Sequence, residues 1–555
     1  MKPLVLFFFI AFIFFSCKKN NITKPVVRIS FNFVKATIND SVFNNTVIYN
    51  VDTSAPAIRI SFNAPINISS VPGNVALVTG ANILPLKYSF DNSDSTLVIK
   101  PTKPLASLTS YTMSVVTAVK SVSDSALKNM VRLTFITQID STDKFPQISD
   151  SALLTLVEQQ TFHYFWDFGH PVSGLARERT SSGDIVTTGG SGFGIMAMLV
   201  GVQRDFITRA QALARIDTIV SFLSNKVTRY HGAFPHWING STGATIPFST
   251  QDDGGDIVET SYMMQGLLCA RQFFNSTTDA NEINLRTEIN DLYNGVDWNW
   301  YRQNGQNVLY WNWSPDYGWA INVQIGGWDE ALITYVLAAS SNVDSSTIPK
   351  IVYDNGWARN GGMKNGNSYY GIQLPLGPAF GGPLFFAHYS FLGINPHNLS
   401  DTYANYWQQD TSHAMINYLY CISNPNHYNG YSNLCWGLTA SDIQNGYTAS
   451  SPTNDVGVIA PTAAVSSLPY TPTQSMNAIR FFYYKLGNKI WSKYGFIDAF
   501  NLSSLWFDSD CLAIDQGPQI VMIENYRSGL LWNLFMSCPE VKRGMTNLGF
   551  HGPNL

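Results

Sequence analysis

The stretch from residue 151 to residue 166, SALLTLVEQQTFHYFW, marks the point where the chain changes from one kind of repeat to another. Its side chains recur at helical spacing, which predicts one helix face made of Ala152, Leu153, Leu156, Val157, Gln160, Phe162 and Phe165. Helical spacing returns near residues 208–226, 255–274, 280–299, 329–341, 401–422, 473–487 and 518–536. About ten to twelve helices joined by long Gly-, Asn- and Trp-rich loops suit an α/α toroid, although periodicity alone allows another α bundle.

Residues 25–138 follow a different pattern, in which apolar and polar residues alternate. The clearest alternating runs are residues 27–31, 57–62, 96–100 and 111–115. Period-two runs separated by Asn, Asp, Pro and Gly turns are typical of an all-β sandwich. The sequence therefore predicts a multidomain chain, with a β-sandwich over residues 25–138, a linker over 139–149 and an all-α domain over 150–555.

The first residues resemble the export signal of a bacterial lipoprotein. Lys2 precedes an apolar run from Leu4 to Phe15, which is shorter than the about 20 residues that a membrane span needs. The run ends at Ser16-Cys17, as in a lipoprotein cleavage box. We predict a signal peptide over residues 1–16, a tether over 17–24 and lipidation of Cys17, which anchors the protein in the cell envelope by its lipid alone. A plain signal peptide with an incidental cysteine is the alternative.

The composition excludes several classes of protein. Charged residues make up 13% of the chain, aromatic residues make up 14%, and the net charge is −4. Disordered chains and coiled coils need more charge and fewer aromatic residues, and a nucleic-acid-binding protein needs a basic face. A neutral, hydrogen-bonding surface suits uncharged, polyhydroxylated ligands. All 14 Trp lie after residue 150, so the aromatic excess belongs to the helical domain.

The first acidic cluster is Asp252, Asp253, Asp256 and Glu259, in a glycine-containing loop that enters a helix. Asp256 and Glu259 share a helix face at spacing i, i+3, which is also the spacing of a capping box. Capping does not account for Asp252 and Asp253, which precede two glycines. The cluster therefore favours a functional role.

The second acidic cluster, Asp329 and Glu330, follows an unusual concentration of tryptophan. Six Trp fall within residues 298–328, and indole faces stack on pyranose rings while carboxylates bind hydroxyl groups. Glycoside hydrolysis needs one protonated and one ionised carboxyl group. The acids of the two clusters are candidates for these carboxyl groups. We predict substrate contacts from Trp311, Trp313, Trp319, Trp328, Asp329, Asp253, Arg177 and Asp455.

No motif predicts a metal or a cofactor. The glycine-rich residues 187–194 lack the Lys of a phosphate-binding loop and favour a sugar-site loop or a plain turn. His231 and His236 are five residues apart, not the four of a helical metal pair. Cys269, Cys421, Cys435, Cys511 and Cys538 have no zinc spacing. They are expected to be buried thiols, with a Cys421–Cys435 disulfide as the alternative.

The helical half resembles the bacterial glucoamylase-like family, which is grouped with the endo-β-1,2-glucanases of glycoside hydrolase family 144. The matching stretches are residues 188–194, 252–259, 326–330, 382–390, 460–464 and 513–518. The first half resembles bacterial Ig-like domains. The resemblance implies an (α/α)6 toroid, no metal, and inverting hydrolysis of β-1,2-glucan to sophoro-oligosaccharides. The resemblance implies catalytic roles for Asp252, Asp256, Glu259 and Glu330; Asp253 is an adjacent acid without such a role, and Asp329 is the alternative to Glu330. Residues 441–447 depart from the family's more acidic loop.

The sequence thus predicts a monomeric hydrolase of a neutral β-glucan. The first alternative is another glucan specificity, or exo action, on the same scaffold. A polysaccharide lyase is disfavoured because its site needs basic or amide groups to neutralise a uronate, and these loops are acidic instead. A non-catalytic glycan-binding lipoprotein stays open, because carboxylates bind sugar hydroxyls without chemistry.

Overall fold

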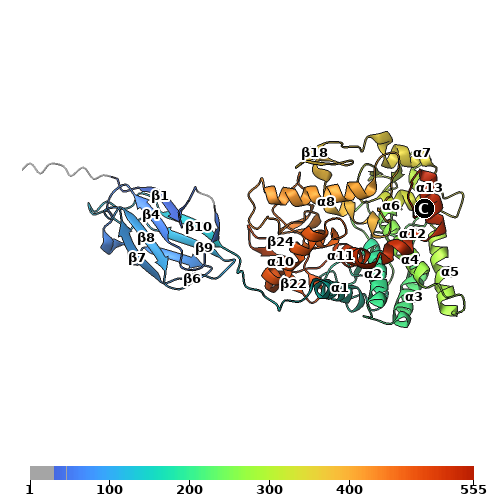
Figure 1. The fold of residues 1–555 in the computed structure, drawn as a ribbon, viewed down its shortest axis with the longest axis horizontal. Coiled ribbons are helices and arrows are strands. Elements are labelled where there is room, and N and C mark those ends of the chain that lie inside the picture. The colour runs from blue at the N-terminus through green and yellow to red at the C-terminus, as the bar shows by residue number, and fades with distance from the viewer. Residues whose placement is uncertain (1–29, 45–46) are drawn as a thin grey trace, which may run out of the picture. The chain divides into compact units, whose positions relative to one another are not determined.

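The computed structural model describes residues 30–44 and 47–555 (Figure 1). The chain divides into two compact units, Met1–Gln138 and Ile139–Leu555. The predicted signal peptide, the tether and Cys17 lie outside the described residues. Among the residues described, no helix is both long enough and apolar enough to cross a membrane.

The first unit is a sandwich of two five-stranded sheets, as its period-two pattern predicts. One sheet has the order β2-β1-β4-β8-β7 and the other β3-β10-β9-β5-β6. Along β4, burial alternates residue by residue, and Ile58, Ile60 and Phe62 enter the core between the sheets. The strands are β1 (Phe33–Ile38), β2 (Ser41–Val42), β3 (Ile48–Val51), β4 (Ile58–Phe62), β5 (Val75–Thr79), β6 (Asn82–Ile83), β7 (Leu86–Asp91), β8 (Thr96–Pro101), β9 (Ser110–Val115) and β10 (Val131–Thr137).

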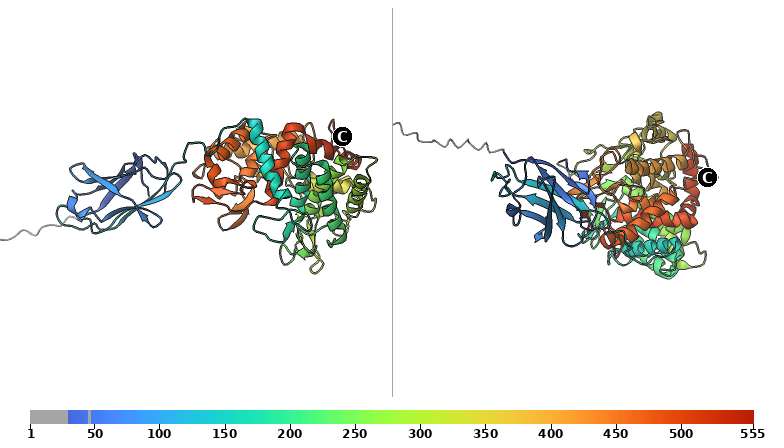
Figure 2. Two further views of the ribbon diagram at one scale, coloured as in Figure 1. Left: turned by 90° about the horizontal axis from the view of Figure 1, so that it is seen from below. Right: turned by 60° about the vertical axis from the view of Figure 1, so that its left-hand side comes forward.

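The second unit is mainly helical, with short two- and three-stranded sheets in its loops (Figure 2). Its helices are α1 (Asp150–Trp166), α2 (Thr188–Gln203), α3 (Arg209–Asn225), α4 (Ile257–Phe273), α5 (Ala280–Asn294), α6 (Leu332–Ala339), α7 (Lys350–Val352), α8 (Tyr406–Ser423), α9 (Pro461–Ser466), α10 (Pro472–Ile490), α11 (Ala513–Ser528), α12 (Leu530–Met536) and α13 (Pro539–Leu548). The loop strands include β11 (Ile185–Thr187), β12 (Trp237–Asn239), β13 (Thr245–Ile246), β14 (Gly255–Asp256), β16 (Asn312–Trp313), β20 (Ala440–Ile443), β21 (Gly446–Ala449), β24 (Phe500–Asn501) and β25 (Trp506–Phe507).

The helices form two concentric rings. The inner ring runs through α2, α4 and α6, then the 3₁₀ turns Leu384–Ala387 and Ser390–Leu392, and then α9 and α11, which closes on α2. The outer layer includes α1, α3, α5, α8, α10 and α13. Helices α2, α4 and α6 are buried on nearly all sides, whereas α3 and α5 bury one face. This arrangement confirms the predicted α/α toroid.

The structure corrects the predicted face of α1. Leu153, Val157, Phe162 and Phe165 are buried as predicted, but Ala152 is exposed. Glu158 is fully buried on this helix and pairs with Arg527 and Arg204. The pattern of apolar residues could not reveal this position, because a buried carboxylate is tolerated only when cations from distant segments neutralise it.

The structure also corrects the prediction for the glycine-rich residues 187–194, because residues 188–194 begin the buried helix α2 and form neither a loop nor a turn. The glycines let neighbouring elements approach closely. A Cβ atom on Gly192 would lie 2.1 Å from the carbonyl oxygen of Tyr262 in α4, and one on Gly266 of α4 would lie 2.1 Å from the carbonyl oxygen of Gly192. The absence of side chains is therefore a packing requirement.

The second unit also tests the predictions for the cysteines and for the helix over residues 518–536. The five cysteines after residue 17 are all buried and unbridged, which confirms free thiols and rejects the Cys421–Cys435 disulfide. The single helix predicted over 518–536 is two helices, because Gly529 has a left-handed φ of 71° and ends α11 before α12 begins.

Candidate active site

A cavity of about 410 Å³ lies where the inner helices begin, and we call it the inner cavity. Glu259 reaches it from the first turn of α4, and Glu330 from the segment just before α6. The hairpin of β20 and β21 contributes Ala440, Tyr447 and Ala449. Its aromatic wall is Trp237, Phe248, Tyr262, Trp311, Phe385, Tyr389 and Tyr447. An apolar pocket with a few convergent polar groups is the usual form of a small-molecule site.

Asp256 lies behind the cavity wall and is fully buried. One carboxylate oxygen caps α4 by accepting the N–H groups of Val258 and Glu259, each at 2.9 Å. The other oxygen contacts Nδ1 of His236 at 3.0 Å and accepts the indole N–H of Trp311 at 3.3 Å. The capping role that the sequence offered as an alternative is therefore real, and the second oxygen positions two residues of the cavity wall.

Glu259 is the carboxylate that links two inner helices. Its Oε2 atom accepts the backbone N–H of Gly189 at 2.6 Å, in the first turn of α2. The N-terminus of α2 is thus occupied by the Glu259 carboxylate, and the helix dipole stabilises negative charge at that end. Burial raises the pKa of Glu259, while positively charged His236 and the Gly189 N–H act in the opposite direction.

His236 carries the positive charge of this site. Burial alone favours the neutral imidazole, but Glu259 and Asp256 outweigh it and raise the pKa of His236 to about 9. The ring is therefore an imidazolium at neutral pH. His236, Asp252 and Asp256 hold potential metal-ligand atoms within 4.8 Å of one another, but a protonated ring has no free lone pair for a metal.

The charged neighbours of Glu330 are anionic, whereas Glu259 has the cationic His236 beside it. Burial raises the pKa of Glu330 well above the ordinary value of 4.5, and the negative charges of Asp329 and Glu259 raise it further. Its backbone carbonyl accepts hydrogen bonds from Ser390 at 2.5 Å and from Tyr262 at 3.3 Å, which fix the main chain at the cavity wall. Burial and these two negative charges therefore favour the protonated form of Glu330.

The remaining predicted acids lie around these residues and not on the cavity wall. Burial, with the charge of Asp256, raises the pKa of Asp252 to about 6. Asp329 accepts the N–H of Ala331 at 2.8 Å, and burial raises the pKa of Asp329 to about 7. Asp253 is half-buried.

Only one of the four predicted tryptophans lines the inner cavity, and that is Trp311. Trp313 packs against His231 and Trp300, and Trp319 packs against Tyr301 and Tyr310. Trp328 is 4% exposed and stacks on Phe391 and Tyr406. The tryptophan concentration is thus mainly loop and core packing, which sequence spacing does not distinguish from a sugar platform.

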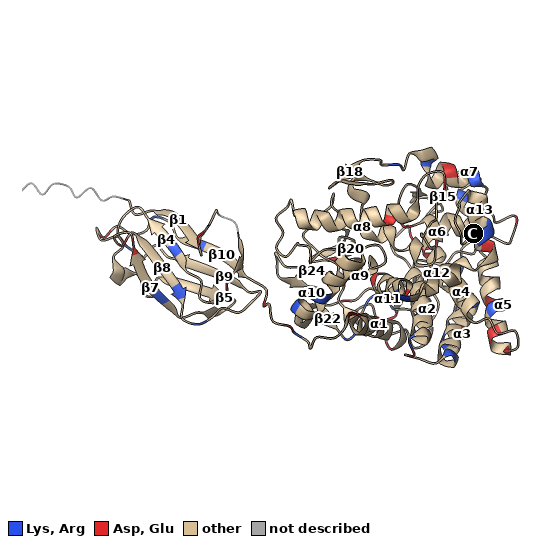
Figure 3. Ribbon diagram, viewed as in Figure 1, with Lys and Arg blue, Asp and Glu red and all other residues tan. Residues whose placement is uncertain are grey.

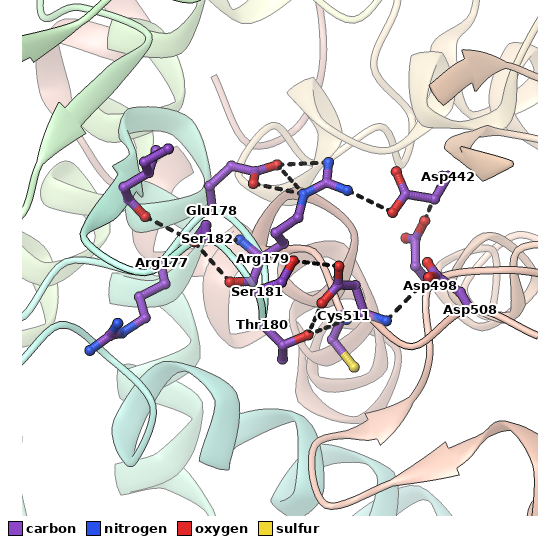
Figure 4. Close-up of polar contacts among 12 residues, drawn as sticks. Arg177, Glu178, Arg179, Thr180, Ser181, Ser182, Asp442, Asp498, Asp508 and Cys511 are labelled. Atoms are coloured by element: carbon purple, nitrogen blue, oxygen red, sulfur yellow. Dashed lines mark hydrogen bonds and ion pairs between the residues drawn. The ribbon is translucent and has the colours of Figure 1, made fainter. Parts of the chain in front are cut away.

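Arg177 and Asp455, for which we predict substrate contacts, do not line the inner cavity. Arg177 donates to the carbonyl of Phe168 at 3.2 Å and points away from the Arg179 guanidinium (Figure 4). Asp455 accepts hydrogen bonds from Tyr420 of α8 at 2.9 Å and from Tyr431 at 2.7 Å. Arg179, two residues further along, lines the cavity instead. Local pairing decides which arginine faces inward, and sequence spacing carries no signal for it.

The two units match different protein families. Residues 322–539 match the family model described as "Putative glucoamylase", and residues 35–137 match the bacterial Ig-like domain. The exo beta-1,2-glucooligosaccharide sophorohydrolase (non-reducing end) of Parabacteroides distasonis is 45% identical over 423 residues, which are 72% of this chain and 58% of that protein. The match thus spans little more than half of that relative's length.

Two solved structures match along their entire length. A protein of Bacteroides uniformis with the same glucoamylase description is 54% identical, with a TM-score of 0.72, over 74% of this chain and 100% of that chain. The endo-beta-1,2-glucanase of Chitinophaga pinensis, solved with sophorotriose and glucose, is 50% identical, with a TM-score of 0.71, over the same shares.

Proposed function

The chain belongs to the bacterial glucoamylase-like family that includes an endo-β-1,2-glucanase, and from this premise we propose that it hydrolyses β-1,2-glucan. The observation that carries the proposal is that Glu330 and Glu259 line one cavity with different neighbours: a cationic His236 and the Gly189 N–H at Glu259, and negative carboxylates at Glu330. Acid–base cleavage of a glycosidic bond needs one carboxyl group that keeps a proton and one that ionises. Burial raises both pKa values, but the neighbours of Glu259 favour ionisation and the neighbours of Glu330 oppose it.

Glu330 is the general acid of this mechanism. Burial and the negative charges of Asp329 and Glu259 raise the pKa of its carboxyl group, which favours the protonated form that an acid catalyst needs. The proton passes to the glycosidic oxygen, directly or through a substrate hydroxyl, as the bond from that oxygen to the anomeric carbon breaks. The leaving chain departs as a neutral alcohol.

Glu259 is the general base. The Gly189 N–H at 2.6 Å and the imidazolium of His236 stabilise its negative charge. An ionised Glu259 takes a proton from the water that attacks the anomeric carbon, and the attack inverts the configuration there. Asp256 touches no substrate in this scheme, and it positions His236 and Trp311.

The test is incubation with linear β-1,2-glucan, followed by sizing of the products and proton NMR of the first anomer released. We expect short sophoro-oligosaccharides of inverted configuration. If sophorose were the only product and came from one chain end, the enzyme would act in an exo manner and not in an endo manner. Binding without product would leave the glycan-binding lipoprotein as the function.

We also propose that the protein is anchored in the bacterial cell envelope through lipidated Cys17 and acts there as a monomer. Lys2, the apolar run to Phe15 and the Ser16-Cys17 junction support the anchor. Labelling with a fatty-acid analogue in a bacterial host should mark the wild type but not Cys17→Ser. Size-exclusion chromatography of the protein without residues 1–24 tests the monomer.

A further inference from the structure

A second cavity adjoins the inner cavity, and the proposed mechanism does not use it. We call it the outer cavity; its volume is about 460 Å³. Arg179 and Tyr447 line both cavities, so the two spaces meet at these side chains. The outer cavity also presents Asp442, Gln444, Trp506 and Asp508.

The groups around the outer cavity are those that bind a sugar ring. Trp506 is half-buried on β25 and offers an indole face, on which the C–H face of a pyranose stacks. Arg179 supplies N–H donors, Asp442 and Asp508 supply acceptors, and Gln444 supplies both.

The polar wall is held in place before any ligand arrives. Arg179 donates to Glu178 at 2.8 Å and to Asp442 at 2.7 Å, and the backbone N–H of Asp442 donates to Asp498 at 2.7 Å (Figure 4). A side chain fixed on both sides loses little further freedom on binding, which favours affinity.

The same wall contains a carboxylate acceptor that the described residues leave unused. Asp508 lines the outer cavity, and its Oδ2 atom has no hydrogen-bond partner among the described residues. Carboxylate oxygens of Asp442, Asp498 and Asp508 lie within 4.8 Å of one another. Hydroxyl groups are neutral donors, so they satisfy such an acceptor without adding charge.

We propose that the outer cavity is a distal subsite that binds a glucosyl residue of the β-1,2-glucan chain while the inner cavity holds the bond to be cleaved. The proposal rests on the proposed function. Chains long enough to enter both cavities gain affinity from the outer cavity, and the shortest substrates do not. Trp506 is thus a determinant of chain-length preference.

The experiment compares wild type, Trp506→Ala and Trp506→Phe on linear β-1,2-glucan and on the shortest sophoro-oligosaccharide that the wild type cleaves. For Trp506→Ala we expect KM for the long glucan to rise about tenfold, and kcat/KM for the short substrate to change less than about twofold. Trp506→Phe keeps an aromatic face and should restore most of the long-chain affinity. Trp300→Ala is the control, because Trp300 is exposed and lines neither cavity.

Equal losses on both substrates, or no loss on either, would overturn the subsite. Tight calcium binding by the wild type that Asp508→Asn removes, without any change in KM, would also overturn it and assign the cavity to a cation. If the wild type cleaved neither substrate, the proposed hydrolase function would be wrong. That result differs from a failure of the subsite alone, in which the wild type still cleaves both substrates.

Discussion

At the scale of single residues, the mechanism depends on the proton held by Glu330. Glu330→Gln keeps the size and hydrogen bonding of the side chain but cannot donate a proton, so we expect kcat to fall by about 10²–10⁴-fold. The backbone contacts of residue 330 with Ser390 and Tyr262 do not involve its side chain, so the midpoint of thermal unfolding should stay near that of the wild type. Reducing-sugar release and thermal unfolding are the measurements.

Asp329→Asn is the matched control for this variant, since Asp329 is the adjacent acid but does not line the inner cavity. It removes a like charge beside Glu330, so activity should fall much less. An active Glu330→Gln, or an inactive Asp329→Asn, would move the acid role to Asp329.

We expect the charge of His236 to influence the acidic limit of activity through the pKa of Glu259. Its pKa of about 9 keeps it positive throughout the working range, where it helps Glu259 to stay ionised. His236→Asn removes the charge but retains an N–H donor for Asp256. The pKa of Glu259 should then rise, and the acidic limb of the kcat/KM profile should move to higher pH by about one unit.

The stability of the protein should change with pH for the same reason. The pKa of His236 is raised on folding, from an ordinary 6.5 to about 9. The ion pair with Asp256 therefore contributes fully below about pH 6.5 and is lost as the pH rises through 9. The wild type should lose this stability between those values, and His236→Asn should not. A parallel decline in both proteins, or an unmoved acidic limb, would show that His236 is neutral in the folded state.

At the scale of elements, the closest contact in the inner ring is the crossing of α2 and α4. Ala at position 192 would place its Cβ 2.1 Å from a backbone oxygen of α4, where no side chain can move aside. We expect Gly192→Ala to lower the free energy of unfolding by about 1–3 kcal/mol or more, and to disturb the Gly189–Glu259 contact on the same helix.

Tryptophan fluorescence during urea unfolding measures this effect, because all 14 Trp lie in the second unit. Ser221→Ala, on the exposed face of α3, is the control and should stay within about 0.5 kcal/mol of the wild type. If Gly192→Ala were as stable as this control, the two helices would be further apart than the structure has them.

The same helix shows where sequence reasoning stops. Helical spacing predicts α4 and α6 although both are buried nearly all round, but it misses α2, because the glycines of residues 188–194 are typical of a loop. The carboxylates of the site follow from spacing and family resemblance. His236, Arg179 and Tyr447 do not, because their roles arise only when segments far apart in the chain meet.

At the scale of the whole molecule, each unit has the means to fold alone. The sandwich buries its own core, and the toroid closes its inner ring without it. Charged residues are sparse in both units, as the mostly tan ribbon of Figure 3 shows, so each depends chiefly on apolar burial. The solved relatives match 74% of this chain along their full length, about the share that the second unit makes up.

Removing residues 1–138 should therefore leave a folded toroid with its active site intact. Every residue that lines the inner cavity lies after residue 138, and so does every residue of the outer cavity. We expect kcat/KM on soluble β-1,2-glucan to stay within about threefold of the full chain, and the fluorescence-detected unfolding midpoint to be unchanged. A tenfold or larger loss in a protein that still unfolds at the same midpoint would mean that the Ig-like unit takes part in substrate binding. A lowered midpoint would mean instead that it stabilises the toroid.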